Sequence, residues 1–157
     1  YYRSFAGQPP GCSVGPNKMG TYKGETAFLI FQNLHRYALY FALAFVVILY
    51  YDAFLALRNG AGEWGVGVGT VVLFMNATLL ACYTFGCHSF RHLIGGHDNH
   101  MSCQGQGGAK LTLWGKATWC NERHMRFAWL SLFWVGFSDI YVRLLSMGLI
   151  TDLNTWN

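Results

Sequence analysis

The chain has 157 residues, enough for one domain, and its composition differs from that of a soluble protein. Hydrophobic residues account for 53% and charged residues for only 11%, against roughly 25% charged residues in ordinary globular domains. The net charge of +4 is modest, and no dense run of Lys and Arg indicates nucleic-acid binding. Because a soluble protein needs charge to cover its surface, these values exclude an ordinary water-exposed domain and predict a surface that largely faces something other than water.

The first segment, residues 1–26, reads as an irregular arm because it is rich in Gly and Pro. It begins at Tyr1 without a Met, and no charged stretch precedes a short apolar core, so we expect no signal peptide here. We expect instead a processed or truncated product from which an N-terminal part is missing.

Residues 27–151 form the predicted transmembrane domain, with apolar segments at about 27–57, 64–94 and 124–150. Each is longer than the roughly 20 residues that cross a bilayer as a helix. A soluble helical bundle would need polar faces at a period near 3.6 residues, and "FALAFVVILYYDAFLAL" has none. We therefore predict an all-α transmembrane helical bundle with three spanning helices.

The distribution of Lys and Arg predicts how these helices are oriented. Nine of the eleven lie before or at the start of the first span or around the polar loop 95–121, and only Arg58 and Arg143 do not. Because cytoplasmic segments carry an excess of Lys and Arg, we expect the N-terminal side and this loop to be cytoplasmic in a multi-pass protein of the bacterial plasma membrane. The tail 152–157 is then outside. Within the loop, "AKLTLWGKATW" predicts one short interfacial helix.

Thiol and imidazole side chains gather in "CYTFGCHSFRH", where the second apolar segment ends. His88 and His92 are four residues apart and share a helix face, with Cys87 beside them. His35, near the start of the first span, is expected at a similar depth below the same membrane face. Ionisable groups inside a membrane are costly and usually face a bundle interior or a site. The pattern predicts a metal or ligand site.

Three cofactors suit such a set. Two Cys and two His are the ligands of a Rieske-type [2Fe–2S] cluster. A b-type haem would need two His on facing helices, which His35 could supply with His88 or His92. Zinc is third, because a structural zinc site has little reason to be buried in a bilayer. The alternative is that each His only bonds a neighbouring helix and each free Cys packs as an apolar residue, as we expect of Cys82. Disulfides are not expected on a reducing cytoplasmic side.

A second set of metal-binding residue types lies in the loop "HDNHMSCQ". Its members are His97, His100 and Cys103, but the loop is hydrophilic, so we favour a water-exposed surface loop. His124, at the start of the third span, is expected to cap the helix or form a salt bridge.

Three strings, "TYKGETAFLIFQNLHRYALYF", "CHSFRHLIGG" and "NERHMRFAWLSLFWVGFSDIYVRLLSMG", resemble the membrane anchor subunit of a respiratory succinate dehydrogenase. More narrowly, they are similar to the single-chain, five-helix class with a Rieske-type [2Fe–2S] cluster among its helices. The resemblance covers Tyr22 to Leu149, that is, the C-terminal three helices of that class. It implies that flavoprotein and iron–sulfur subunits oxidise succinate on the cytoplasmic side and that this chain passes the electrons to a quinone.

The resemblance also implies metal ligands. Cys87, His88 and His92 match the Cys/His string of the family, and His35 matches the "HRY" of the preceding helix. For the second thiolate we choose Cys12, in the loop "PPGCSVGP".

Two places could bind the quinone. Asp139 and Arg143 are four residues apart, so they can form an ion pair, or else "SDIYVRL" lines a polar slot where Asp139 or Tyr141 shares a proton with a quinone. Arg36, Tyr37 and His88 are the alternative, closer to the proposed cluster. In a different class of protein, a small transporter or a purely structural subunit, the third helix would line a pathway and the Cys/His set would be incidental.

Overall fold

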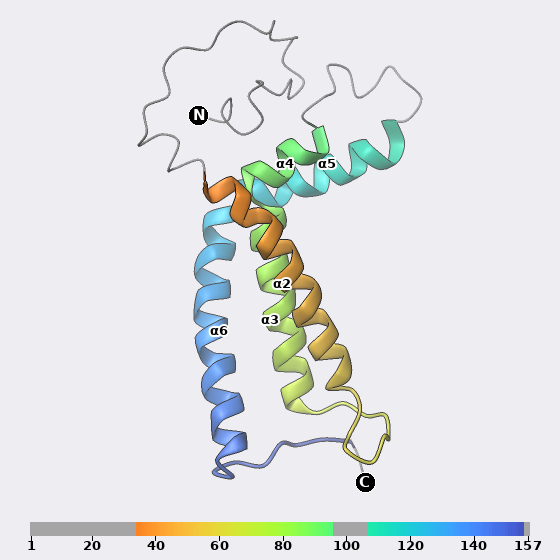
Figure 1. The fold of residues 1–157 in the computed structure, drawn as a ribbon, viewed down its shortest axis with the longest axis vertical. Coiled ribbons are helices and arrows are strands. Elements are labelled where there is room, and N and C mark those ends of the chain that lie inside the picture. The colour runs from red at the N-terminus through yellow and green to blue at the C-terminus, as the bar shows by residue number, and fades with distance from the viewer. Residues whose placement is uncertain (1–33, 96–106, 156–157) are drawn as a thin grey trace, which may run out of the picture. The chain divides into compact units, whose positions relative to one another are not determined.

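The computed structural model describes residues 34–95 and 107–155. Their regular structure consists of five helices, labelled in Figure 1 and listed here: α2 (His35–Leu55), α3 (Val68–Phe85), α4 (His88–Gly95), α5 (Gly107–Glu122) and α6 (His124–Ser146). Within the described residues the only strand-like pairings are two isolated bridges, so the predicted all-α class is confirmed.

The chain divides into two compact units. The α4–α5 unit comprises Tyr1–Ala42 and Thr84–His124, and the spanning unit comprises Leu43–Tyr83 and Met125–Asn157.

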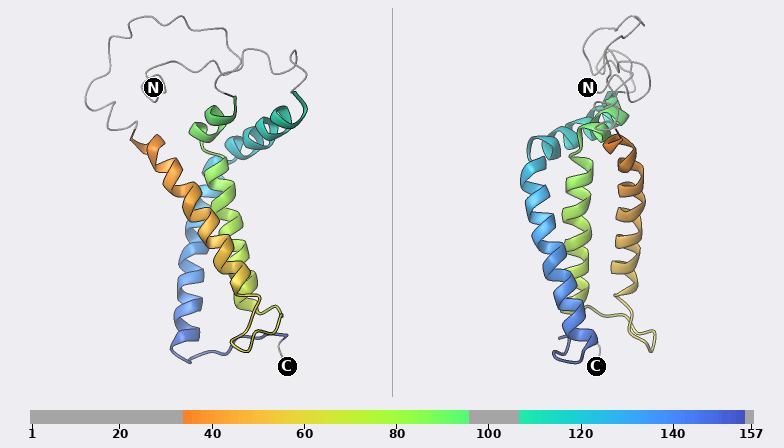
Figure 2. Two further views of the ribbon diagram at one scale, coloured as in Figure 1. Left: turned by 45° about the vertical axis from the view of Figure 1, so that its right-hand side comes forward. Right: turned by 60° about the vertical axis from the view of Figure 1, so that its left-hand side comes forward.

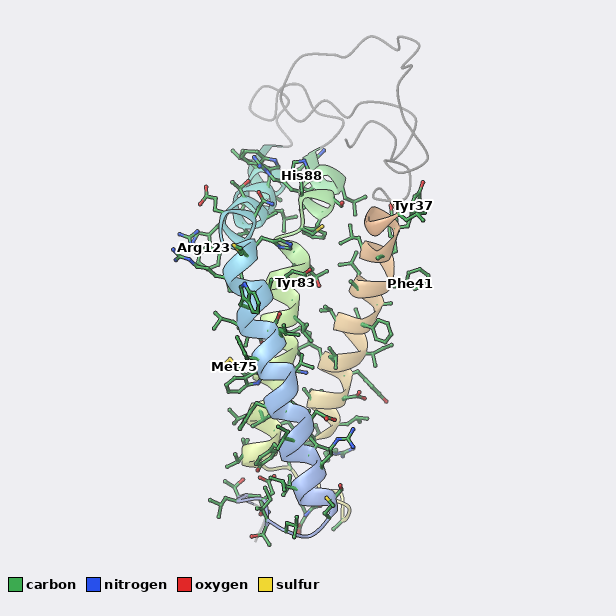
Figure 3. The ribbon with its side chains drawn as sticks, turned by 90° about the vertical axis from the view of Figure 1, so that its left-hand side faces the viewer. Tyr37, Phe41, Met75, Tyr83, His88 and Arg123 are labelled. Carbon is green, nitrogen blue, oxygen red and sulfur yellow. The ribbon has the colours of Figure 1, made fainter. Side chains whose placement is uncertain are left out.

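Three helices are long and apolar enough to cross a membrane, over Tyr37–Leu55, Val68–Phe85 and His124–Ser146. They correspond to the three predicted spans. Large apolar side chains such as Phe41 and Phe133 are 70% and 71% exposed, and Figure 3 shows Phe41 extending away from α2. Helices with apolar residues on their outer face are expected where the surroundings are lipid. Residues 27–33 of the first predicted span lie outside the described residues.

The second span ends earlier than predicted, because α3 stops at Phe85 and α4 starts anew at His88. The carbonyl of Gly86 accepts a hydrogen bond from Asn121 Nδ2 at 2.8 Å instead of continuing the ladder of α3. The Cys87 N–H donates to Thr84 O at 3.1 Å, and the Cys87 carbonyl accepts the first N–H groups of α4, from Phe90 and Arg91. The prediction of one continuous helix to residue 94 is therefore wrong.

The third span ends at Ser146 rather than at 150. Gly148 has a positive φ of 70°. Its N–H donates to Leu145 O at 3.0 Å, and the Leu149 N–H donates to Leu144 O at 3.0 Å. This pair of bonds is a Schellman motif, which ends a helix and satisfies its last carbonyls.

The helix predicted within the loop is present and longer than expected, since α5 runs from Gly107 to Glu122. It lies beside α4 in Figures 1 and 2. Small side chains are buried on both helices, Ser89 on α4 and Ala117 on α5. The Arg91 guanidinium of α4 stacks over the Trp114 ring of α5 at 4.6 Å. Close approach and this cation–π contact hold the helix pair together.

Small and hydroxyl-bearing residues also form the core of the spanning unit, as expected where helices pack inside a bilayer. Three hydrogen bonds link its elements. Trp134 Nε1 donates to Val72 O at 3.1 Å, Thr70 Oγ1 donates to Ala56 O at 2.7 Å, and the hydroxyls of Tyr50 and Thr78 lie 3.1 Å apart. The buried residues of this unit include Val46, Ala53, Thr70, Val72, Ala77, Ala81, Ser131 and Ser138.

Candidate functional site

The junction between α3 and α4 carries a thiol and an imidazole. Cys87 and His88 are consecutive residues at the helix break, and both are half-buried. Figure 3 shows His88 at the start of α4. Phe85 precedes this break and Phe90 follows it, and their rings contact each other with centroids 4.9 Å apart. The two donor groups are therefore partly enclosed, and an aromatic contact bridges the break on which they lie.

The remaining predicted ligands are described only in part. His92 lies one turn after His88 in α4, and His35 begins α2; the backbone of both is described, whereas their side chains are not. Cys12 lies outside the described residues, as do His97, His100 and Cys103 of the alternative set. Among the side chains that the structure describes, no group of three or more His, Cys, Asp or Glu could hold a metal ion.

The donors at the junction fit a metal site in their chemistry. A thiolate and an imidazole suit iron–sulfur clusters and zinc. Cys87 and His88 supply one sulfur and one nitrogen, which is half of the two-Cys, two-His set. The start of α2 with His35 belongs to the same α4–α5 unit as the junction.

Neither of the other two described thiols forms a disulfide within the described residues. Cys82 and Cys120 are both half-buried, so Cys82 is less enclosed than the buried apolar role predicted for it.

The predicted ion pair on α6 is confirmed. Arg143 Nε lies 2.8 Å from Asp139 Oδ2, with the side chains 72% and 58% exposed. Both groups therefore lie on the outer surface of the spanning unit rather than in its packed core.

Tyr141 faces a different partner from the one expected. Its hydroxyl donates to Asp152 Oδ1 at 2.6 Å, and the two Asp152 oxygens accept the Gly69 N–H at 3.0 and 3.3 Å. Asp152 thus caps the N-terminus of α3 and ties it to α6. The neighbouring backbone adds a bond from Val68 N to Leu153 O at 2.9 Å. We call Asp152, Tyr141 and Gly69 the tail cap.

The sequence did not reveal three polar residues that matter here. Asp152 reaches Gly69 across 83 residues, and Asn121 reaches Gly86 across 35, so no local spacing connects them. Asn76 lies within α3 with its Oδ1 atom buried and without a hydrogen-bond partner among the described residues. For Asn76, the only indication in the sequence was the presence of a single Asn in an apolar segment. His124 begins α6, as expected, and is half-buried.

Tyr37, which was predicted with Arg36 to bind the quinone, lies near the start of α2 and is 48% exposed. Only the backbone of Arg36 is described.

Comparison with known proteins identifies the family of this chain. The model for actinobacterial succinate dehydrogenase subunit SdhC matches residues 1–148. A solved chain of the Mycobacterium smegmatis Sdh1 complex in the apo form is similar to this chain, with 38% sequence identity and a TM-score of 0.75. The match covers 100% of this chain and 58% of that chain, so this chain spans little more than half the length of the solved one. A comparison with curated proteins gives no match.

Proposed function

Because the chain belongs to the actinobacterial succinate dehydrogenase SdhC family, we propose that it is a membrane anchor that passes electrons from succinate oxidation to a quinone. Flavoprotein and iron–sulfur subunits are the proposed partners, on the cytoplasmic side where the positively charged segments are expected. The observation that carries the electron-transfer part is that Cys87 and His88 are consecutive, half-buried residues at the break between α3 and α4.

The proposed cofactor is a Rieske-type [2Fe–2S] cluster. Cys87 and Cys12 would supply the sulfur ligands, and two of His35, His88 and His92 the nitrogen ligands. When bound, such a cluster takes up and releases single electrons, at a potential raised by its imidazole ligands. The chain holds Cys87 in place through the three backbone bonds of its N–H and carbonyl groups and through the Asn121 bond to the preceding carbonyl. The Phe85–Phe90 contact joins the helix ends on the two sides of Cys87.

We place the quinone near Arg36 and Tyr37, at the start of α2. Reduction of a quinone takes two electrons and two protons, so hydrogen-bond donors should face its two carbonyl oxygens. Arg36 and Tyr37 belong to the same compact unit as Cys87 and His88, which favours a short path for electrons.

A matched pair of thiol variants tests the cluster in the assembled, detergent-purified complex. We expect Cys87→Ala to abolish the iron and acid-labile sulfide of the anchor and the succinate:quinone reductase activity together. Cys82→Ala, five residues earlier and also half-buried, should keep both. The double variant His88→Ala/His92→Ala should behave like Cys87→Ala.

Two results would overturn the cluster proposal. One is unchanged iron and sulfide in Cys87→Ala when the subunits remain assembled. The other is a sharp reduced alpha band in the absorption spectrum that disappears in the histidine variants, which would assign a b-type haem instead.

A further inference from the structure

Helix α5 carries a stripe of polar and aromatic side chains on its outward side. Thr112, Lys116, Trp119 and Arg123 follow one another at helical spacing of four, three and four residues, so they share one face. Lys116 and Thr112 are exposed, Trp119 is 51% exposed, and the Arg123 side chain is 37% exposed. The buried residue Ala117 points to another side of the helix. We call these four residues the α5 stripe.

Chain connectivity fixes the depth of Arg123, the last residue of this stripe. α5 ends at Glu122 and the spanning helix α6 begins at His124, so Arg123 is the single residue between them. The 23 residues of α6 span about 34 Å at a rise of about 1.5 Å per residue, slightly more than the roughly 30 Å of a bilayer core. Arg123 and Trp119, one turn before it, must therefore lie at the level of the lipid headgroups.

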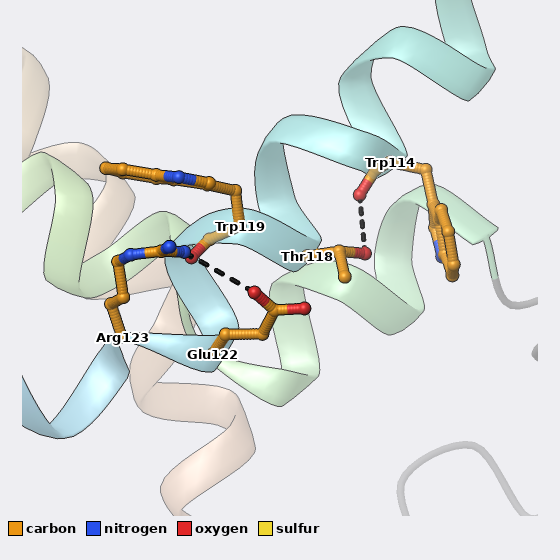
Figure 4. A network of polar contacts seen from close by, with 5 residues as sticks. All are labelled: Trp114, Thr118, Trp119, Glu122 and Arg123. Atoms are coloured by element: carbon orange, nitrogen blue, oxygen red, sulfur yellow. Dashed lines mark hydrogen bonds and ion pairs between the residues drawn. The ribbon is translucent and has the colours of Figure 1, made fainter.

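The geometry around Arg123 suits a phosphate group. Figure 4 shows its guanidinium beneath the Trp119 ring, 4.4 Å from the ring centroid. Nη1 donates to Trp119 O at 3.1 Å and lies 3.4 Å from Glu122 Oε2. A guanidinium carries five N–H donors, more than these two contacts use, and its planar fork matches phosphate oxygens. The stacked ring holds the fork in one orientation.

The charge of the surrounding surface has the matching sign. Within the described residues from 84 to 124 there are four cationic side chains, Arg91, Lys110, Lys116 and Arg123, and one carboxylate, Glu122. Leu111 and Leu113, beside the stripe, are 45% and 55% exposed. Basic residues combined with exposed Trp and Leu are typical of a helix that rests on anionic lipid.

We propose that the α5 stripe binds the phosphate of an anionic phospholipid headgroup, with Arg123 and Lys116 as the charged contacts and Trp119 at the acyl boundary. An acidic protein surface could meet the same charges. The lipid is favoured because Arg123 is joined directly to a spanning helix and because the neighbouring leucines are exposed. This inference requires only that α6 crosses the membrane, and it does not rest on the cluster.

The test uses the detergent-purified complex titrated with phosphatidylglycerol or phosphatidylcholine, with bound lipid counted by mass spectrometry. Each removed cation should weaken phosphatidylglycerol binding about fivefold, since a cation near an anionic surface contributes about 1 kcal/mol. The Lys116→Gln/Arg123→Gln variant should therefore lose well over tenfold. The control Lys110→Gln removes the same kind of charge from α5 outside the stripe and should change binding much less. Iron content is measured in every variant and should not change.

Three outcomes would overturn the proposal. Equal losses in Lys110→Gln and Lys116→Gln would mean general attraction and no site. Equal binding of phosphatidylcholine and phosphatidylglycerol would mean that the stripe does not recognise the charge of the headgroup. Release of the iron–sulfur subunit from Lys116→Gln/Arg123→Gln, with bound lipid unchanged, would assign the stripe to a protein contact.

Discussion

The start of α3 has its polar groups bonded within the chain, whereas the end of α3 breaks beside a thiol and an imidazole. At the start, Asp152 accepts the Gly69 N–H and the Tyr141 hydroxyl, and the C-terminal segment covers the first turn. At the end, the Gly86 carbonyl leaves the helical ladder for Asn121, and Cys87 and His88 follow. Backbone groups near a bilayer need partners in both places.

This comparison of the two ends of α3 separates the end with a structural role from the end at which we propose the cofactor. A carboxylate that holds two donors at hydrogen-bond distance already has its partners, so the tail cap is a structural device. The other end satisfies its backbone through Asn121 and carries the thiol and the imidazole of the chemistry proposed above. Variants at the two ends should therefore separate stability from cofactor content.

Asp152→Ala should produce the largest loss of stability. It removes the charged acceptor of both the Tyr141 hydroxyl and the Gly69 N–H, so we expect the free energy of unfolding to fall by about 2–4 kcal/mol. Thermal unfolding of the purified complex in detergent measures this. The iron content of the complex that remains folded should be unchanged.

Asp139→Ala is the matched control, because Asp139 is also a bonded carboxylate but lies on the surface of α6 beside Arg143. Asp139 has one charged partner on its own helix, and Arg143 lies in the last turn of α6, from which its long side chain can extend to the membrane interface. The effect of Asp139→Ala should therefore be smaller than that of Asp152→Ala. Similar shifts of the melting temperature in the two variants would show that the tail cap has no special role.

Asn121→Ala should have an intermediate effect on stability and a clear effect on the junction. The variant leaves the buried Gly86 carbonyl without its 2.8 Å donor, which should cost about 1–2 kcal/mol. Since Cys87 follows Gly86 directly, we expect iron occupancy to fall as well. Asn154→Ala is the control, because Asn154 Nδ2 also donates to a backbone carbonyl, that of Asp152 at 3.2 Å, but on the surface. Full iron content in Asn121→Ala would separate the helix break from cofactor binding.

The existence and type of the helices could be predicted from the sequence because the signal is local. Long apolar runs without a polar face indicate spanning helices wherever they occur. The end of α6 was also readable in principle, since Gly148 follows the last turn and only a residue tolerant of positive φ ends a helix in this way. The end of α3 could not be predicted in this way, because the Gly86 carbonyl bonds to Asn121, which lies 35 residues further along the chain.

The candidate site divides along the same line. The Asp139–Arg143 pair was predicted because four residues on a helix place two side chains together. The Tyr141–Asp152–Gly69 contacts were missed because they depend on where the C-terminal segment returns. The adjacency of Cys87 and His88 follows from the sequence itself, whereas the helix break that presents them was a structural finding.

Two glycine variants should give the smallest effects, with opposite signs. A Cβ at Gly69 would lie 3.0 Å from Asp152 Oδ2 and 3.6 Å from Tyr141 Cε1. Because the Tyr141 hydroxyl holds that carboxylate at 2.6 Å, it cannot move away without losing a bond, so Gly69→Ala should lower the free energy of unfolding by about 1 kcal/mol. At Gly136, in the middle of α6, nothing lies within 4 Å of the added Cβ. Gly136→Ala should therefore stabilise the protein by up to about 1 kcal/mol, through the higher helix propensity of Ala. Thermal unfolding of the two variants side by side measures the contrast. Stabilisation by Gly69→Ala would mean that the tail cap can accommodate the added methyl group, contrary to the 3.0 Å distance to Asp152 Oδ2.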